Sequence, residues 1–258
     1  MIFPIRLSPP ACLSLFLVLN VSAGLSRVNA QNSLTIAAAS DLSPLEPLLK
    51  EAFPVGNLTF TFASSGVLAR QIENGAPFDL FLSASEEFMN QLVKKRKVAK
   101  EEIQIYAIGR IGLWGKSGAV KTLRDLTQPG VKVIAIANPQ LAPYGAAAIA
   151  ALQKSGMYER VQPMLVYGEN VRQAMQFVET GNAEAGILAW SLIYDKGGYL
   201  VPDDLHPALR QVAAPVSRKG GNAKGAEEFI QFLLSPVGRG ILARHGFNLL
   251  PPPPRLRR

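Results

Sequence analysis

Four short segments of small or polar residues each stand between a predicted strand and a predicted helix. Residues 39–41 read Ala-Ser-Asp, 63–66 read Ala-Ser-Ser-Gly, 142–145 read Ala-Pro-Tyr-Gly and 168–171 read Gly-Glu-Asn-Val. The first-turn N–H groups of a helix have no partner within the helix and carry partial positive charge. Ligands of open α/β sheets bind at the carboxyl ends of the strands. Together with serine hydroxyls, such helix starts can hold an anion without lysine or arginine.

Each of these residues also has an ordinary structural explanation. Ser40, Ser65 and Asn170 are good helix N-caps. The side chain of Val171 suits a hydrophobic core, which leaves only its backbone N–H for a ligand, and Tyr144 can cover a site or simply pack. The anion-binding interpretation therefore depends on the joint placement of the segments.

The residue types that usually carry catalysis or hold metals are scarce. The two histidines, His206 and His245, lie in no His-x-Glu or His-Glu-x-x-His motif. Residues 115–117 (Gly-Lys-Ser) resemble the end of a phosphate loop, but position 110, where its earlier glycine belongs, is arginine. A paired-carboxylate hydrolase stays open, although no feature marks one. We expect no enzyme, no cofactor and no metal held directly by side chains.

The first thirty residues have the three parts of a secretory signal. Residues 1–6 form a short, positively charged segment, and residues 11–25 are mostly apolar. Residues 28–30 (Val-Asn-Ala) place small residues where signal peptidase recognises its cleavage site. The apolar run is too short to span a membrane. We expect a signal peptide at 1–30, removed after Ala30, and a periplasmic mature protein. Cys12, in a context unlike that of a lipoprotein, is the only cysteine, so the mature chain has no thiol or disulfide.

The positive charge of the chain is concentrated at its ends. The formal net charge of +8 falls to +6 without Arg6 and Arg27 of the signal, and to +3 without the three arginines of segment 251–258. We expect that proline-rich segment to be a disordered basic tail. The remaining charge is too small and scattered for nucleic-acid binding, but a mildly basic body favours the approach of anions.

Strand and helix patterns alternate along the chain. The first series has strands at 34–38, 58–62 and 79–82 and helices at 42–53, 67–72 and 86–95. The second has an apolar stretch at 105–114, strands at 131–137, 164–166 and 185–189 and helices at 144–154 and 171–178, followed by an extended segment at 212–216 and helices at 226–234 and 237–245. Short connections of this kind predict an α/β protein with parallel or mixed sheets flanked by helices.

The two series predict two lobes. Lobe I comprises residues 31–108 plus 216–250, and lobe II comprises 109–215. The chain then crosses between the lobes near Gly109 and near Pro215, and two crossings form a hinge that can close on a ligand.

Several segments resemble the periplasmic molybdate-binding proteins of ABC transporters. The resemblance is carried by residues 34–42 (LTIAAASDL), 62–77 (FASSGVLARQIENGAP), 79–84 (DLFLSA), 170–172 (NVR) and 245–247 (HGF), and it extends over nearly the whole mature chain. It implies the two-lobed type II periplasmic binding protein fold. It also implies capture of molybdate or tungstate as an oxyanion and its delivery to an ABC permease, by a protein that we expect to be a monomer.

The resemblance also implies a set of ligand-binding residues. Two serines of the first lobe match Ser40 and Ser65, and two backbone donors of the second lobe match Tyr144 and Val171. A tyrosine donor that some members have corresponds here to Ala189, so we expect the Tyr144 hydroxyl to replace it.

Asp41 stands beside one of these serines, and a carboxylate aimed at a dianion would repel it. We therefore expect its side chain to turn away, while its backbone N–H can still donate.

The implied mechanism is closure of the two lobes around the ion. A site made only of donors disfavours a protonated oxyanion, because its O–H finds no acceptor. The alternative function is the same fold tuned to sulfate or another tetrahedral oxyanion. An uncharacterised hydrolase and a ligand-sensing module are more distant alternatives, and no helix-turn-helix segment supports the latter.

Overall fold

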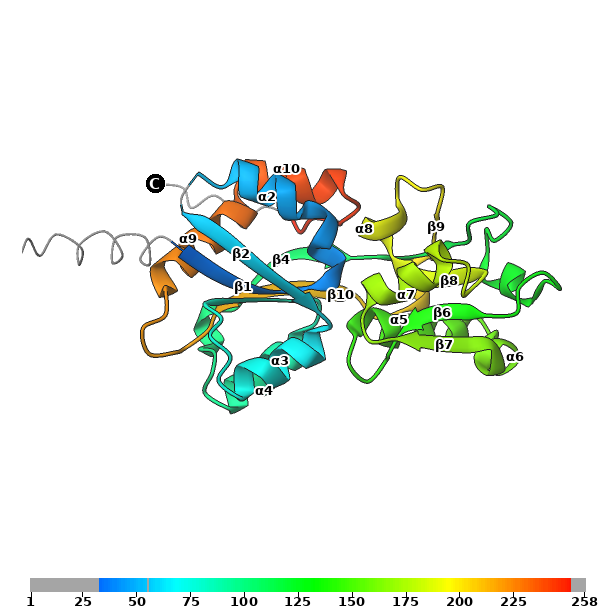
Figure 1. Ribbon diagram of the computed structural model, residues 1–258, viewed down its shortest axis with the longest axis horizontal. Coiled ribbons are helices and arrows are strands. Elements are labelled where there is room, and N and C mark those ends of the chain that lie inside the picture. The colour runs from blue at the N-terminus through cyan, green and yellow to red at the C-terminus, as the bar shows by residue number, and fades with distance from the viewer. Residues whose placement is uncertain (1–32, 55, 252–258) are drawn as a thin grey trace, which may run out of the picture. The chain divides into compact units, whose positions relative to one another are not determined.

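The computed structural model describes residues 33–54 and 56–251 (Figure 1). The expected signal peptide and all but the first residue of the expected tail lie outside the described residues. The described chain forms two five-stranded mixed sheets, with strand orders β2-β1-β3-β10-β4 and β7-β6-β8-β5-β9. The predicted α/β class with two helix-flanked sheets is confirmed.

The first sheet is parallel at one edge and antiparallel at the other. Its strands are β1 (Ser33–Ala39), β2 (Asn57–Ala63), β3 (Leu80–Ser83), β4 (Gln104–Gly109) and β10 (Leu209–Pro215). β1 pairs in parallel with β2 and β3, while β10 runs antiparallel to β3 and β4. β1 and β3 are buried over most of their length, which explains their continuous apolar sequences.

Helices cover both faces of this sheet. One face packs against α2 (Glu46–Ala52), α9 (Ala223–Leu234) and α10 (Pro236–Arg244), and the other against α3 (Ser65–Glu73) and α4 (Glu86–Lys94) (Figure 1). Each face has its own hydrophobic core, and the first includes a cluster of phenylalanine rings around Phe229.

The second sheet is built on the same plan. Its strands are β5 (Ile111–Trp114), β6 (Ile134–Ala137), β7 (Leu165–Gly168), β8 (Ala185–Ala189) and β9 (Tyr199–Leu200). β6 pairs in parallel with β7 and β8, and β5 runs antiparallel to β8 and β9. The helices α5 (Pro143–Lys154) and α7 (Val171–Glu179) pack on it, and one continuous core joins these elements.

Shorter elements complete the described chain. They are the 3₁₀ helices η1 (Ser40–Leu45), η2 (Lys100–Glu102), η3 (Leu123–Thr127), η4 (Gln162–Met164) and η5 (Asp203–Leu205), and the single-turn helices α6 (Tyr158–Val161) and α8 (Trp190–Ile193). The helix expected at 42–53 is therefore divided into η1 and α2. Pro44 lies inside η1, and Pro47 takes the second position of α2, where its missing N–H costs nothing.

The chain passes between the two sheets twice. The first passage is a single residue, Arg110, between β4 and β5, close to the predicted crossing at Gly109. The second lies between the end of β9 and the start of β10, because all of β10 pairs with strands of the first sheet. The crossing expected from the sequence near Pro215 falls at the last residue of β10.

No helix among the described residues is long and apolar enough to cross a membrane.

Candidate functional site

Both candidate serines lie where a strand of the first sheet ends. Ser40 follows β1 and begins η1, and Ser65 is the first residue of α3 after β2. Both are buried, with 3% and 0% of their surfaces exposed. The N-cap positions of these helices are Ala39 and Ser64, and neither helix has a side-chain cap hydrogen bond. Helix capping therefore does not account for Ser40 or Ser65.

The hydroxyl of Ser65 is positioned by the neighbouring strand. The backbone N–H of Ala84, just past β3, donates to Ser65 Oγ at 3.0 Å. A hydroxyl oxygen that accepts a hydrogen bond still carries its own proton, so Ser65 keeps a donor. Ser64 Oγ is also buried, and it has no hydrogen-bond partner within the described chain. The start of α3 thus presents two buried hydroxyls, of which sequence reasoning singled out one.

Val171 is the first residue of α7, and its backbone N–H makes no hydrogen bond to the capping side chain of that helix. Asn170 Oδ1 accepts from the N–H groups of Arg172 and Gln173 at 3.0 and 3.1 Å. Because a first-turn N–H has no acceptor within the helix, this cap leaves the N–H of Val171 as a donor. The Val171 side chain is buried in the core, as predicted.

Tyr144 takes the second position of α5, directly after Pro143. Its N–H likewise has no acceptor within the helix. The next residue, Gly145, approaches the carbonyl oxygen of Ala137 so closely that an added Cβ would overlap it. Glycine is therefore required for α5 to begin against the end of β6, which fixes the position of the Tyr144 N–H.

The hydroxyl of Tyr144 belongs to a buried polar network. It donates to Asp41 Oδ2 at 2.8 Å and accepts from Gln211 Nε2 at 3.3 Å. The hydroxyl of Tyr106 in turn donates to Gln211 Oε1 at 3.4 Å. All four side chains are buried. The Asp41 side chain faces the hydroxyl of Tyr144, itself a candidate ligand residue. That it turns away from the bound ion stays a prediction.

Asp41 is a carboxyl group in an unusual environment. Burial raises its pKa to about 7, although the hydrogen bond from Tyr144 opposes this shift. The second carboxyl oxygen, Oδ1, is buried without a hydrogen-bond partner in the described part of the chain. The group therefore gains or loses its proton near neutral pH.

Two further hydrogen bonds join the elements of the two sheets around these residues. The N–H of Gly66, in the first turn of α3, donates to the carbonyl of Leu141 just before α5 at 2.9 Å. Ser191 Oγ of α8 donates to the carbonyl oxygen of Asp41 at 2.8 Å. These bonds hold the start of α3 and the start of η1 against the second sheet.

Apolar contacts reinforce the same arrangement. Ala39 ends β1 and Ala84 directly follows β3. Both belong to the hydrophobic cluster that contains Tyr144 and Val171. Helix α7 also contacts η1. The segments carrying the four candidate residues therefore meet at the carboxyl ends of β1, β2, β6 and β7.

Sequence reasoning missed some members of this arrangement. It named Ala189, which ends β8 and is fully buried, but not the nearby Ser191, whose hydroxyl donates to the backbone carbonyl of Asp41. Gln211 lies on β10 and is fully buried. A glutamine among the apolar residues of segment 209–215 was the available signal, but its partners are distant in sequence.

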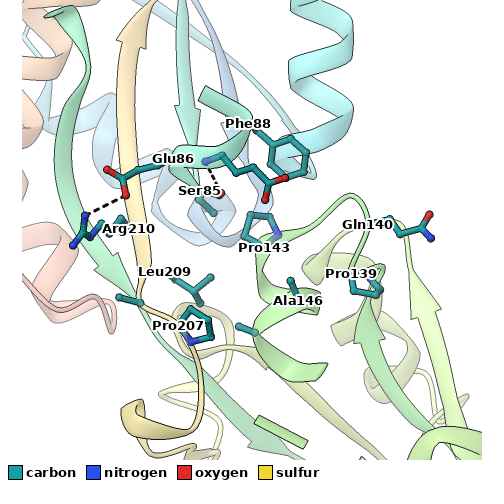
Figure 2. Close-up of a pocket in the computed structure, with 14 residues that line it drawn as sticks. Ser85, Glu86, Phe88, Pro139, Gln140, Pro143, Ala146, Pro207, Leu209 and Arg210 are labelled. Atoms are coloured by element: carbon teal, nitrogen blue, oxygen red, sulfur yellow. Dashed lines mark hydrogen bonds and ion pairs between the residues drawn. The ribbon is translucent and has the colours of Figure 1, made fainter. Parts of the chain in front are cut away.

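A cavity of about 470 Å³ lies beside this site, between β10 and the starts of α4 and α5 (Figure 2). Phe88, Pro143 and Leu209 give it apolar walls, and an ion pair of Glu86 with Arg210 at 3.3 Å lies at its edge. Within the described ranges, no cluster of three or more histidine, cysteine, aspartate or glutamate side chains is arranged to hold a metal ion.

Comparison with known proteins gives a consistent picture. Residues 34–248 match the family model described as bacterial extracellular solute-binding protein. The chain is 35% identical over 194 residues to the molybdate-binding protein ModA of Rhodobacter capsulatus, covering 74% of this chain and 77% of the relative. It is 34% identical over 245 residues to ModA of Azotobacter vinelandii, covering 90% and 97%.

A solved structure shows the same architecture. The periplasmic molybdate-binding protein of Azotobacter vinelandii superposes with a TM-score of 0.79 at 26% identity, covering 84% of this chain and 99% of that one. The type II periplasmic binding protein fold predicted from the sequence is thereby confirmed.

Proposed function

Because the chain belongs to the family of bacterial extracellular solute-binding proteins, we propose that it captures molybdate or tungstate outside the cytoplasmic membrane and delivers the ion to an ABC permease. The two relatives described above are named molybdate-binding proteins. The proposal includes export through a signal peptide at residues 1–30 and action as a monomer. It includes no catalysis and no cofactor.

The observation that carries this proposal is the set of donors at the ends of four strands. Ser40 and Ser65 supply hydroxyls. Tyr144 and Val171 supply backbone N–H groups that have no hydrogen-bond acceptor within their own helices. A buried dianion is stable only when hydrogen bonds surround it. Hydrogen bonds to a charged partner contribute about 1.5–3 kcal/mol each, so four donors can replace much of the lost hydration.

The donors come from both sheets, which supports a closing mechanism. The serines follow strands of the first sheet, and the two backbone donors follow strands of the second. An ion first bound by the serines would therefore favour approach of the second lobe, because only the closed state supplies all donors. The lobes would be residues 31–108 with 216–250, and 109–215. The pairing of β10 argues for moving residues 209–215 into the first lobe.

Selectivity would follow from the size and proton requirements of this site. Molybdate and tungstate are nearly equal in size and share it, whereas the smaller sulfate leaves longer and weaker hydrogen bonds. The hydroxyl of Tyr144 is the candidate for an additional donor in place of the tyrosine that Ala189 replaces. This hydroxyl donates to Asp41 Oδ2 at 2.8 Å.

Titration calorimetry of the exported protein tests the proposal. Molybdate and tungstate should bind more tightly than sulfate. The variants Ser40→Ala and Ser65→Ala should each lose about 1–3 kcal/mol of binding free energy, which corresponds to about 5- to 150-fold in Kd. The exposed Ser217 provides a matched control, because Ser217→Ala removes the same atoms away from the site. Equal molybdate affinity in all four proteins would refute the proposal.

A further inference from the structure

The hydrogen bonds around Asp41 all run in one direction. Tyr106 donates to Gln211, Gln211 donates to Tyr144, and Tyr144 donates to Asp41. A tyrosine hydroxyl has a single proton. While Asp41 is ionised, the hydroxyl proton of Tyr144 is therefore committed to the carboxylate and cannot be donated to a ligand.

Protonation of Asp41 reverses the last step of this chain. A protonated carboxyl is itself a donor. It can donate to the hydroxyl oxygen of Tyr144 or, through Oδ1, which has no hydrogen-bond partner in the described chain, to an anion bound beside it. In the first case the Tyr144 proton is released for the ligand. In either case the site gains one donor and loses one negative charge, and both changes favour a dianion.

No cation close to Asp41 offsets its charge within the described chain. The titratable groups that interact with it electrostatically are Tyr144 on α5 and Tyr106 on β4, and its own backbone N–H also lowers its pKa. Gln211 on β10 and Ser191 on α8 are neutral.

Most charged side chains on the helices packed against η1 are paired with one another, and the remaining one, Glu51 of α2, is exposed. On α7, Arg172 pairs with Glu179 at 2.8 Å, and on α2, Lys50 pairs with Glu46 at 2.7 Å. The ionisation of Asp41 therefore responds mainly to burial and to any anion placed beside it.

We propose that the protein binds its oxyanion together with one proton, which Asp41 takes up, so that Asp41 is a specificity-determining residue that makes capture depend on pH. The inference rests on the proposed function, because it concerns the same site. Burial already raises the pKa of Asp41 to about 7, and a bound dianion beside the carboxyl raises it further.

The direction of the pH dependence follows from these two pKa values. Below the pKa of the empty site, Asp41 is already protonated and affinity does not vary with pH. Between the pKa of the empty site and that of the occupied site, each binding event takes up a proton. Affinity then falls by up to about tenfold for each unit of rising pH.

The variant Asp41→Asn isolates this effect. Asparagine has nearly the same shape, offers a permanent N–H donor and has no titratable group. Its molybdate affinity should be nearly independent of pH. Asp204 is exposed, so Asp204→Asn removes an aspartate elsewhere and should behave as the unaltered protein does.

Calorimetry with sodium molybdate in two buffers of different ionisation enthalpy measures the protons taken up. At about pH 8, the unaltered protein and Asp204→Asn should take up close to one proton per ion, and Asp41→Asn close to none. From about pH 7 to about pH 9, the first two should lose affinity by up to about 100-fold.

A second variant covers the case in which Asp41→Asn fails to fold, which circular dichroism would reveal. Tyr144→Phe removes the hydrogen bond that opposes the raised pKa of Asp41. The pH at which affinity begins to fall should therefore move upward.

The outcomes separate the two proposals. Molybdate binding without proton uptake, with the same pH profile in Asp41→Asn or no shift in Tyr144→Phe, would overturn the coupling and leave the proposed function intact. Absence of molybdate binding in every variant and in the unaltered protein would overturn both.

Discussion

Substituting Gly109 by alanine should disrupt the Tyr144–Asp41 contact without altering either residue. Gly109 ends β4, and its φ lies outside the left-handed region, so alanine is compatible with the backbone. An added Cβ would lie 2.6 Å from Gln211 Nε2 and would overlap the hydroxyl oxygen of Tyr144. Both side chains must therefore move, by about 1 Å if ordinary van der Waals contact is to be restored.

A shift of that size breaks the network. The bond from Tyr144 to Asp41 is 2.8 Å long, and a displacement of about 1 Å takes it past the range of a hydrogen bond. Overpacking of a core costs about 1–3 kcal/mol. With about 2–4 °C of melting temperature per kcal/mol for a chain of this size, Gly109→Ala should melt several degrees lower.

The matched control is Gly130→Ala. Gly130 is exposed, an added Cβ there meets nothing, and its φ is also outside the left-handed region. This substitution should be neutral or stabilising by up to about 1 kcal/mol. Thermal unfolding followed by circular dichroism compares the two variants. Equal melting temperatures would refute the inference that position 109 must be glycine to leave room for the Tyr144 hydroxyl.

Two further predictions concern residues that hold the site's elements in place. Burial raises the pKa of Asp79, but hydrogen bonds from Asn222, Thr35 and Arg218 outweigh it and hold the pKa below its usual value. The resulting stability should be present above about pH 4, the pKa in the unfolded chain, and lost as pH falls through the folded-state pKa. Asp79→Asn should therefore lower the free energy of unfolding at neutral pH by about 1–3 kcal/mol, measured by urea denaturation. The free energy of unfolding should also depend less on pH below about pH 4 in this variant, and an unchanged pH dependence there would contradict the prediction. Asn170→Ala should lower the free energy of unfolding by about 1 kcal/mol, because α7 loses its N-cap. It should also weaken molybdate binding, because the cap positions the N–H of Val171. A destabilised variant with normal molybdate affinity would show that the cap does not position the ligand donor.

The sequence predicted the parts of the fold that depend on local pattern. The apolar run of β1 and the polar residues after it placed Ser40 at a strand end, and Asn170 behaved as the cap that its type suggests. The division of segment 42–53 into two helices was readable in principle from Pro44 and Pro47. It was missed because the leucine spacing fits one continuous helix.

Contacts between distant segments were beyond such reasoning. Asp41 and Tyr144 are 103 positions apart, and Asp41 and Ser191 are 150 apart. Repulsion between a carboxylate and a dianion predicted that Asp41 turns away. This reasoning assumed that the group stays ionised, whereas burial brings its pKa close to neutral. The environment that sets the charge of the group exists only in the folded chain.

A crystal structure of the exported protein with molybdate, using the anomalous scattering of molybdenum, tests the central claim most directly. The account predicts one strong peak with oxygens within hydrogen-bond distance of Ser40 Oγ, Ser65 Oγ and the backbone nitrogens of Tyr144 and Val171. A peak in the cavity of Figure 2 instead, or an ion held by lysine and arginine side chains elsewhere, would contradict it.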